Sequence, residues 1–351
     1  MDLSNDKLIF FIGSYTEMLT PNFGGSGKGV STVSLNLNSG VIEFLNAYMV
    51  RNPAYLTANN GYLYAVTEVE DINAPKVSSF KILDDFSLKF VNEQPLDGSL
   101  PCHINTVNNN LLVACYGSGN LVFFPLGAKG TILGCSHNFV HKGKSINKDR
   151  QEAPHAHQAV VHPDGERVFV TDLGIDKIKV YRLKEGILEG LPEKDISIPK
   201  GNGPRHMVFN TEGNLCYVMN ELTGKIAILK YKEDKFYFEK LYDALPASFT
   251  GVPSGSAIRI HPNGAYLYAA NRTVDVITIF EIKNEELHML AYQLTNGKTL
   301  REFNITPDGN WLIACLQDSN EVINYAITAS GLLEEKSRTN SIVSPVCVCF
   351  L

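Results

Sequence analysis

A turn that ends in glycine recurs along the chain at a nearly constant interval, and this repeat limits the possible folds more than any other feature. Each copy has a short apolar run on either side of the turn, as where His162-Pro163-Asp164-Gly165 leads into Arg167-Val168-Phe169-Val170. Turns of this kind favour proline and aspartate early and glycine last. The intervals are 48, 51 and 45 residues between the turn glycines Gly165, Gly213, Gly264 and Gly309. A period of about 45 residues with several short strands in each unit is typical of a β-propeller blade.

Two weaker copies precede these four, and the two ends of the chain complete a seventh. The weaker copies turn near Asn60-Gly61 and Asn109-Asn110. Ser344-Pro345-Val346-Cys347-Val348 is typical of a first strand without a turn after it, and Phe10-Phe11-Ile12-Gly13-Ser14 of a second strand without a first. Pairing these ends closes a ring and removes the exposed sheet edges. We therefore predict an all-β, seven-bladed propeller in which residues 1–351 form a single domain and the last blade is shared by the N- and C-terminal strands. A β-sandwich or two sheet domains would explain the short strands but not the matched ends.

Charge and composition argue against several classes of partner. The formal net charge is -6, whereas a nucleic-acid-binding protein needs a basic face. The sequence has no run near the ~20 apolar residues of a membrane helix, and its acidic start is unlike a secretory signal. Seven cysteines without a CxxC pair indicate reduced thiols. We expect a cytoplasmic protein, a monomer or weak homodimer, that binds neither nucleic acid nor membrane.

Counting from each turn glycine brings polar side chains to one end of the ring. Residues eight positions before the glycine begin the innermost strand, and residues eight positions after it end the next strand. Because antiparallel neighbours place these two points at the same edge, their side chains should meet at one mouth of the central channel. The first set is His157, Arg205, Ser256 and Arg301, and the second is Leu173, Glu221, Arg272 and Gln317.

Five residues near this mouth are candidates for chemistry, and each has a structural alternative. His155 and His157 lie two residues apart and should project to the same side, but a third metal ligand is missing, so we expect no metal. Either histidine could act as a general base near neutral pH, or cap the strand. Arg205 and Arg272 could bind an anion or stabilise an oxyanion, or could form salt bridges between blades. Glu221 could carry a proton, or simply hold one of the arginines.

The remaining polar positions are less informative. His206 could face the neighbouring blade, and the turn residues His162 and His261 should be solvated. The sequence has neither a Gly-x-Ser-x-Gly elbow nor a glycine-rich phosphate loop before a helix, so we expect no serine triad and no cofactor. Residues 17–29 and 143–152 break the repeat, and we expect them to be surface loops that shape the binding mouth.

Three pairs of motifs in the central units form an ordered set, namely Pro154-His155-Ala156-His157-Gln158 with Asp172-Leu173-Gly174-x-Asp176, Gly203-Pro204-Arg205-His206 with Asn220-Glu221-Leu222, and Asn271-Arg272 with Asp275. This set resembles the lactonase family of seven-bladed propellers, which contains bacterial 6-phosphogluconolactonase and the fungal carboxymuconate-lactonizing enzymes. The ends, Phe11-Ile12-Gly13-Ser14-Tyr15-Thr16 and Pro345-Val346-Cys347-Val348, are similar to those of the family, so the resemblance spans the whole chain. It implies metal-independent lactone chemistry at the propeller mouth, carried by His155 or His157 with Arg205, Glu221 and Arg272.

One position departs from the family pattern. The family often has an acid after the alanine of the fifth-unit strand, and Gly255-Ser256-Ala257-Ile258 has none. If that acid helps catalysis in relatives, the departure implies a slower enzyme, a different substrate or lost activity.

The leading hypothesis is hydrolysis of a small anionic lactone, first of all 6-phosphogluconolactone in the oxidative pentose phosphate route. Arg205 and Arg272 would bind the phosphate or the oxyanion, and His157 or Glu221 would activate water. Two alternatives remain open. One is lactonization of a carboxymuconate-type diacid, and the other is a propeller without catalysis that binds a protein through an apolar patch at the mouth. The expected substrate contacts are Arg205, Arg272, His206, Gln317 and Tyr15.

Overall fold

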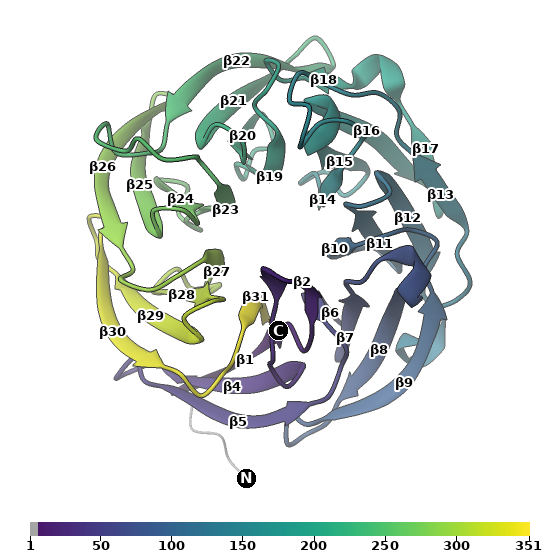
Figure 1. Cartoon of the computed structure of the whole chain (residues 1–351), viewed down its shortest axis with the longest axis vertical. Helices are drawn as coiled ribbons and strands as arrows, with labels where there is room; N and C mark the ends of the chain where they lie inside the picture. The colour runs from purple at the N-terminus through teal and green to yellow at the C-terminus, as the bar shows by residue number, and fades with distance from the viewer. Residues whose placement is uncertain (1–5) are drawn as a thin grey trace.

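The computed structural model describes residues 6–351 as a ring of seven antiparallel sheets around a central axis (Figure 1). One strand of each sheet lies beside the axis and the other strands follow outward, as in a propeller blade. Residues 1–5, on which part of the expectation about a secretory signal rests, lie outside the described residues. No helix in residues 6–351 is long and apolar enough to cross a membrane.

The blades are numbered in chain order, and their strands are given from the axis outward. Blade 1 contains β31 (Pro345–Phe350), β1 (Lys7–Ser14), β4 (Val30–Asn36) and β5 (Ile42–Tyr48); blade 2 contains β6 (Pro53–Asn59), β7 (Tyr62–Thr67), β8 (Lys76–Ile82) and β9 (Leu88–Pro95); blade 3 contains β10 (Pro101–Val107), β11 (Asn110–Cys115), β12 (Asn120–Pro125) and β13 (His137–Val140). Blade 4 contains β14 (Ala156–Val161), β15 (Arg167–Asp172), β16 (Lys177–Lys184) and β17 (Ile187–Gly190), with the short β18 (Ile196–Ser197) also paired to β16. Blade 5 contains β19 (Pro204–Phe209), β20 (Leu215–Asn220), β21 (Lys225–Lys232) and β22 (Lys235–Asp243); blade 6 contains β23 (Gly255–Ile260), β24 (Tyr266–Asn271), β25 (Val276–Lys283) and β26 (Glu286–Leu294); blade 7 contains β27 (Leu300–Ile305), β28 (Trp311–Leu316), β29 (Glu321–Ile327) and β30 (Leu333–Thr339).

Short elements lie in the connections between these strands. A small hairpin of β2 (Met18–Thr20) and β3 (Phe23–Gly24) interrupts blade 1. The 3-10 helices are η1 (Asp71–Asn73), η2 (Ala128–Gly130), η3 (Leu173–Ile175) and η4 (Pro192–Lys194).

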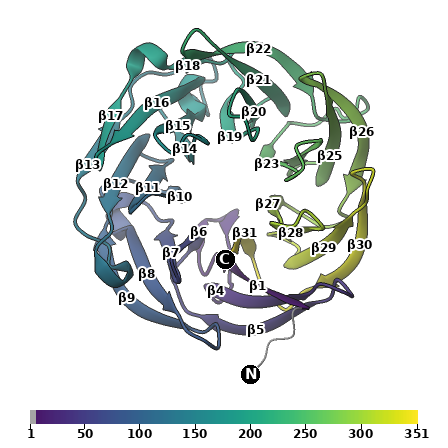
Figure 2. The ribbon, with the colours of Figure 1, turned by 180° about the vertical axis from the view of Figure 1, so that it is seen from behind.

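The ring closes through the two ends of the chain, as the sequence predicts. β1 pairs antiparallel with β31, with Phe10 opposite Phe350 and Ile12 opposite Val348. Figure 2, seen from behind, shows β31 next to the axis and β1 beside it. Closure removes the unpaired inner edge that β1 would otherwise present. The predicted seven-bladed propeller is therefore confirmed.

Apolar contacts between neighbouring blades form the core. One cluster, for example, joins Tyr217 and Ile228 of blade 5 to Ile258 and Phe280 of blade 6, and all four side chains are buried. A strand covered on both faces needs apolar residues on both, so it is a nearly continuous apolar run. This explains why the inner strands of the sequence are apolar runs instead of strictly alternating ones.

The turn histidines hold one blade to the next, so the expectation that His162 is solvated is wrong. His162 is only 5% exposed, and its Nε2 atom lies 2.7 Å from the carbonyl oxygen of Gly213, the turn glycine of the next blade. Half-buried His261 makes the same contact with Gly309 at 2.8 Å. A Cβ atom on Gly213 would lie 2.7 Å from the His162 ring. The glycine therefore leaves room for the histidine, and the two positions form one contact.

A register shift near the start of the innermost strands positions the side chains at the mouth. In blade 5, Pro204 pairs with Asn220 and His206 pairs with Met219, so Arg205 is left unpaired between them. Such a bulge releases one residue from the ladder and redirects its side chain. The same shift leaves one residue unpaired in blades 3, 4 and 7, namely Cys102, His157 and Arg301.

Candidate active site

A cavity of about 500 Å³ lies at the mouth of the channel, and residues from all seven blades or their connections line it. Two structural positions supply most of its polar wall. One is the bulge of the innermost strand, and the other is the residue that directly follows the second strand of a blade. The polar and charged lining includes Glu68, Tyr116, His157, Glu221, Arg272, Arg301 and Gln317.

Glu221 is the centre of a cluster of three arginines, which come from blade 5, from blade 6 and from the loop before β14. Its Oε2 atom lies 3.1 Å from Nε of Arg205 and 3.0 Å from Nη2 of Arg272, and its Oε1 atom accepts a 2.6 Å hydrogen bond from Arg150. Burial alone would raise the pKa of Glu221, but Arg272, Arg150 and Arg205 outweigh it and hold the pKa well below its usual range. Three guanidinium groups against one carboxylate leave a local excess of two positive charges.

The three arginines differ in their access to the cavity. Arg205 is 3% exposed and its Nη1 atom donates to the carbonyl oxygen of Ser256, so it supports Glu221 from within the protein. Arg272 and Arg150 line the cavity, with side chains 16% and 41% exposed. Arg150 belongs to the loop before β14, which the sequence assigned only to the rim of the mouth.

His157 lines the cavity, whereas His155 packs beside it on the ring of Tyr116. The His155 ring stacks on Tyr116 at 4.4 Å, and its nitrogens lie within hydrogen-bond distance of the Tyr116 carbonyl oxygen and of Glu152. The Nδ1 atom of His157 lies 3.9 Å from Sγ of Cys102. Burial, with the nearby charge of Arg205, holds the pKa of His157 well below its usual range, so its imidazole is neutral at pH 7. The bulge at His157 is what separates the roles of the two histidines.

A second charged group lies in the same wall, and its carboxylate, Glu68, was not predicted, whereas Tyr15 and Arg301 were both expected at the mouth. The Tyr15 hydroxyl donates a 2.5 Å hydrogen bond to Oε2 of Glu68, and Nη2 of Arg301 donates a 2.6 Å hydrogen bond to the same hydroxyl. Gln317 lines the cavity beside them, and its Nε2 atom donates to the carbonyl oxygen of Gly24 in the β2–β3 hairpin.

Glu68 lies seven residues after the turn glycine Gly61, one short of the eight that define the other positions at the mouth. It shares a different feature with them, because it directly follows the second strand of its blade. The residues that directly follow β1, β7, β11, β15, β20, β24 and β28 are Tyr15, Glu68, Tyr116, Leu173, Glu221, Arg272 and Gln317.

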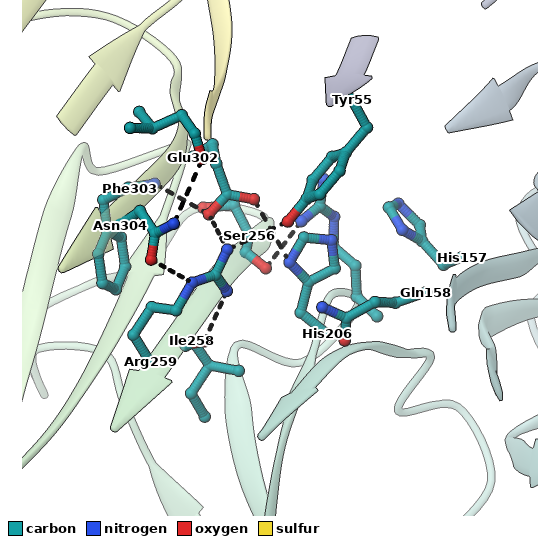
Figure 3. A network of polar contacts seen from close by, with 12 residues as sticks. Tyr55, His157, Gln158, His206, Ser256, Ile258, Arg259, Glu302, Phe303 and Asn304 are labelled. Carbon is teal, nitrogen blue, oxygen red and sulfur yellow. Dashed lines mark hydrogen bonds and ion pairs between the residues drawn. The ribbon is translucent and has the colours of Figure 1, made fainter. Parts of the chain in front are cut away.

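His206 lies between His157 and the ion pair of half-buried Arg259 with buried Glu302 (Figure 3). Its ring is 5.3 Å from that of His157, and its Nδ1 atom is 3.6 Å from Oε2 of Glu302. Glu302 also accepts a 2.9 Å hydrogen bond from Arg259, which donates to the Tyr55 hydroxyl at 3.1 Å. His206 therefore supports the floor of the site from inside the channel.

The segment that lacks the family's acid lies in β23, where Ala257 and Ile258 are both fully buried. The carboxylates that line the cavity near the arginines come from other blades, as Glu68 and Glu221. Among residues 6–351, no group of three or more histidine, cysteine, aspartate or glutamate side chains is arranged to hold a metal ion.

Comparison with known proteins gives matches along nearly the whole chain. Residues 9–350 match the family model described as "Lactonase, 7-bladed beta-propeller". A 6-phosphogluconolactonase of Bacillus subtilis is 31% identical over 98% of this chain and 99% of its own length. Two crystal structures of candidate 6-phosphogluconolactonases are similar as well. The Bacteroides fragilis protein has 30% identity and a TM-score of 0.91 over 100% of this chain and 99% of that one. The Bacteroides uniformis protein has 31% identity and a TM-score of 0.90, and the match covers 99% of this chain and 100% of that one.

Proposed function

The chain belongs to the lactonase family of seven-bladed β-propellers, and on that premise we propose that it hydrolyses 6-phosphogluconolactone to 6-phosphogluconate. The observation that carries this choice of an anionic lactone is the arginine cluster around Glu221 in the cavity. Such an enzyme would act in the oxidative pentose phosphate route of the cytoplasm.

Arg272 and Arg150 are the proposed binding site for the phosphate group. Both line the cavity, and the cluster to which they belong is positive in a protein of formal net charge -6. Within residues 6–351, the buried Nε atom of Arg272 has no hydrogen-bond partner. Planar guanidinium groups bind phosphate and carboxylate oxygens in pairs. A phosphorylated lactone would therefore place its anionic end here, and the substrate carbonyl would lie further along the cavity.

His157 is the better of the two predicted bases for activating water. Both oxygens of Glu221 are held by arginines, so they are less free to accept a proton than the ring of His157, which lines the cavity. The neutral imidazole of His157 can accept a proton from water as the water oxygen attacks the lactone carbonyl. Base catalysis of this kind contributes roughly 100-fold to 10,000-fold in rate.

The other predicted residues have supporting roles in this proposal. Arg205 keeps Glu221 ionised, and His206 holds the inner face of His157. His155 fixes the ring of Tyr116 beside His157. Gln317 contacts the substrate while it holds the β2–β3 hairpin over one side of the mouth.

The test is turnover of 6-phosphogluconolactone and of unphosphorylated gluconolactone, each corrected for spontaneous hydrolysis. Arg272→Met should raise KM for the phosphorylated lactone roughly 10- to 150-fold, since a hydrogen bond to a charged group contributes about 1.5–3 kcal/mol. KM for gluconolactone should change much less. Arg182→Met is the matched control, because its side chain is 46% exposed on an outer strand of blade 4.

Wild-type protein that hydrolyses neither lactone faster than buffer would refute the proposed function. A carboxymuconate-type diacid should be assayed in parallel. Conversion of the diacid alone would assign the chain to the lactonizing branch of the family.

A further inference from the structure

Glu68 is a second carboxylate in the wall of the cavity, and the roles proposed above leave it without a function. It directly follows β7 in blade 2, is 4% exposed, and lines the same cavity as His157 and Arg272. A buried carboxylate is costly unless it is paired. Glu68 and Glu221 are paired in different ways.

A chain of hydrogen bonds fixes one oxygen of Glu68. Arg301 donates to the Tyr15 oxygen at 2.6 Å, and the Tyr15 hydroxyl then donates to Oε2 of Glu68 at 2.5 Å. Tyr15 is fully buried, and burial raises the pKa of its phenol, so it remains a donor. Because Oε2 is the atom that accepts, Oε1 is left to a ligand or a proton in the cavity. Glu221 differs, since arginines hold both of its oxygens.

The two carboxylates also differ in their acidity. Burial raises the pKa of Glu68 above its usual value, although Arg301 and the Tyr15 hydrogen bond act in the opposite direction. The arginine cluster does the reverse to Glu221. A site that holds one carboxyl as a permanent anion and lets the other keep a proton is typical of acid–base catalysis.

We propose that Glu68 is a further catalytic residue, the general acid that protonates the ring oxygen of the lactone when that oxygen leaves. This role rests on the proposed lactone hydrolysis. Water attacks the carbonyl carbon and gives a proton to His157, so that a new C–O bond forms. The bond between the carbonyl carbon and the ring oxygen then breaks, and the ring oxygen takes the proton of Glu68 Oε1. The product carboxylic acid and the His157 imidazolium lose their protons to solvent, and Glu68 takes one up again.

The test is the pH dependence of kcat for 6-phosphogluconolactone in wild type and four variants. A general acid must be protonated, so wild-type kcat should fall as pH rises through the pKa of Glu68. Glu68→Gln keeps the shape of the side chain and an acceptor for Tyr15. We expect it to lower kcat roughly 100-fold or more and to abolish that alkaline decrease. Tyr15→Phe removes a hydrogen bond that lowers the pKa of Glu68, so the decrease should move to higher pH. Glu70→Gln, an exposed residue two positions along the chain, is the matched control and should behave as wild type.

A binding measurement and a second substitution at Glu68 keep the outcomes distinct. Affinity for 6-phosphogluconate, measured by calorimetry, should be nearly the same in Glu68→Gln and wild type, because the arginine cluster is intact. Glu68→Asp retains a titratable group, so it should keep an alkaline decrease at a reduced kcat. If wild type hydrolyses the lactone and Glu68→Gln matches its kcat and pH profile, Glu68 is not the acid while the proposed function stands. If Glu68→Gln loses product affinity to the same extent as kcat, its role is structural and the proposal fails.

Discussion

Replacement of Glu221 by glutamine would remove the one carboxylate that the three arginines share. The resulting loss in free energy of unfolding depends on how deeply each arginine side chain is buried. Arg150 is 41% exposed, so its pair contributes only about 0–1 kcal/mol. Arg205 is 3% exposed and cannot rehydrate without disrupting blade 5. Leaving such a charge unpaired costs about 3–5 kcal/mol.

This free energy corresponds to a measurable change in Tm. At ~2.1 cal/mol/K for each residue, a chain of 351 residues has an unfolding entropy of about 0.7 kcal/mol/K. Glu221→Gln should therefore lower Tm by about 4–7 °C in differential scanning calorimetry at pH 7. The double variant Arg205→Met/Glu221→Gln removes the stranded charge as well, so we expect it to recover part of the loss.

The lowered pKa of Glu221 also determines how the Tm difference between wild type and Glu221→Gln depends on pH. A carboxylate with a lowered pKa stabilises the fold above its unfolded pKa of about 4.3, and that stability is lost as pH falls through the folded pKa. The difference in Tm between wild type and Glu221→Gln should be constant from about pH 6 to 8 and decrease only in acid. A shift below about 1 °C at pH 7, or a double variant no more stable than the single one, would contradict this account.

The fold itself gives three further predictions. Gly165 and Gly213 both have positive φ, but only at Gly213 would a Cβ atom meet a neighbouring ring, so Gly213→Ala should lower Tm more than Gly165→Ala in parallel melts. Deleting residues 345–351 removes β31 and leaves β1 as an open edge, so the truncated chain should aggregate or unfold, which size-exclusion chromatography and circular dichroism would show. Cys135 is the exposed cysteine and the other six are buried, so a thiol reagent should titrate one group in the native protein and seven after denaturation. Rapid reaction of several thiols in the native protein would contradict the blade packing.

The sequence alone determined the propeller, because its signals are local or periodic. Turn glycines at a regular spacing specify the number of hairpins, and the unmatched strands at the two ends can be satisfied only by each other. The same periodicity correctly brought His157, Glu221, Arg272 and Gln317 into one cavity, since residues at equal steps along equivalent hairpins reach the same edge of the ring.

The tertiary structure decided which of these side chains reach the cavity. The register of each innermost strand shifts at the bulge, and this shift puts His157 in the cavity wall but leaves His155 stacked on Tyr116. Arg150 reaches Glu221 from a loop that has no counterpart in the repeat. The partners of Glu68 come from the first and the last blades, Tyr15 and Arg301, which lie 286 residues apart in sequence. The repeat places these three residues at the same mouth, but only the closed ring shows that Tyr15 and Arg301 are the groups that hold Glu68.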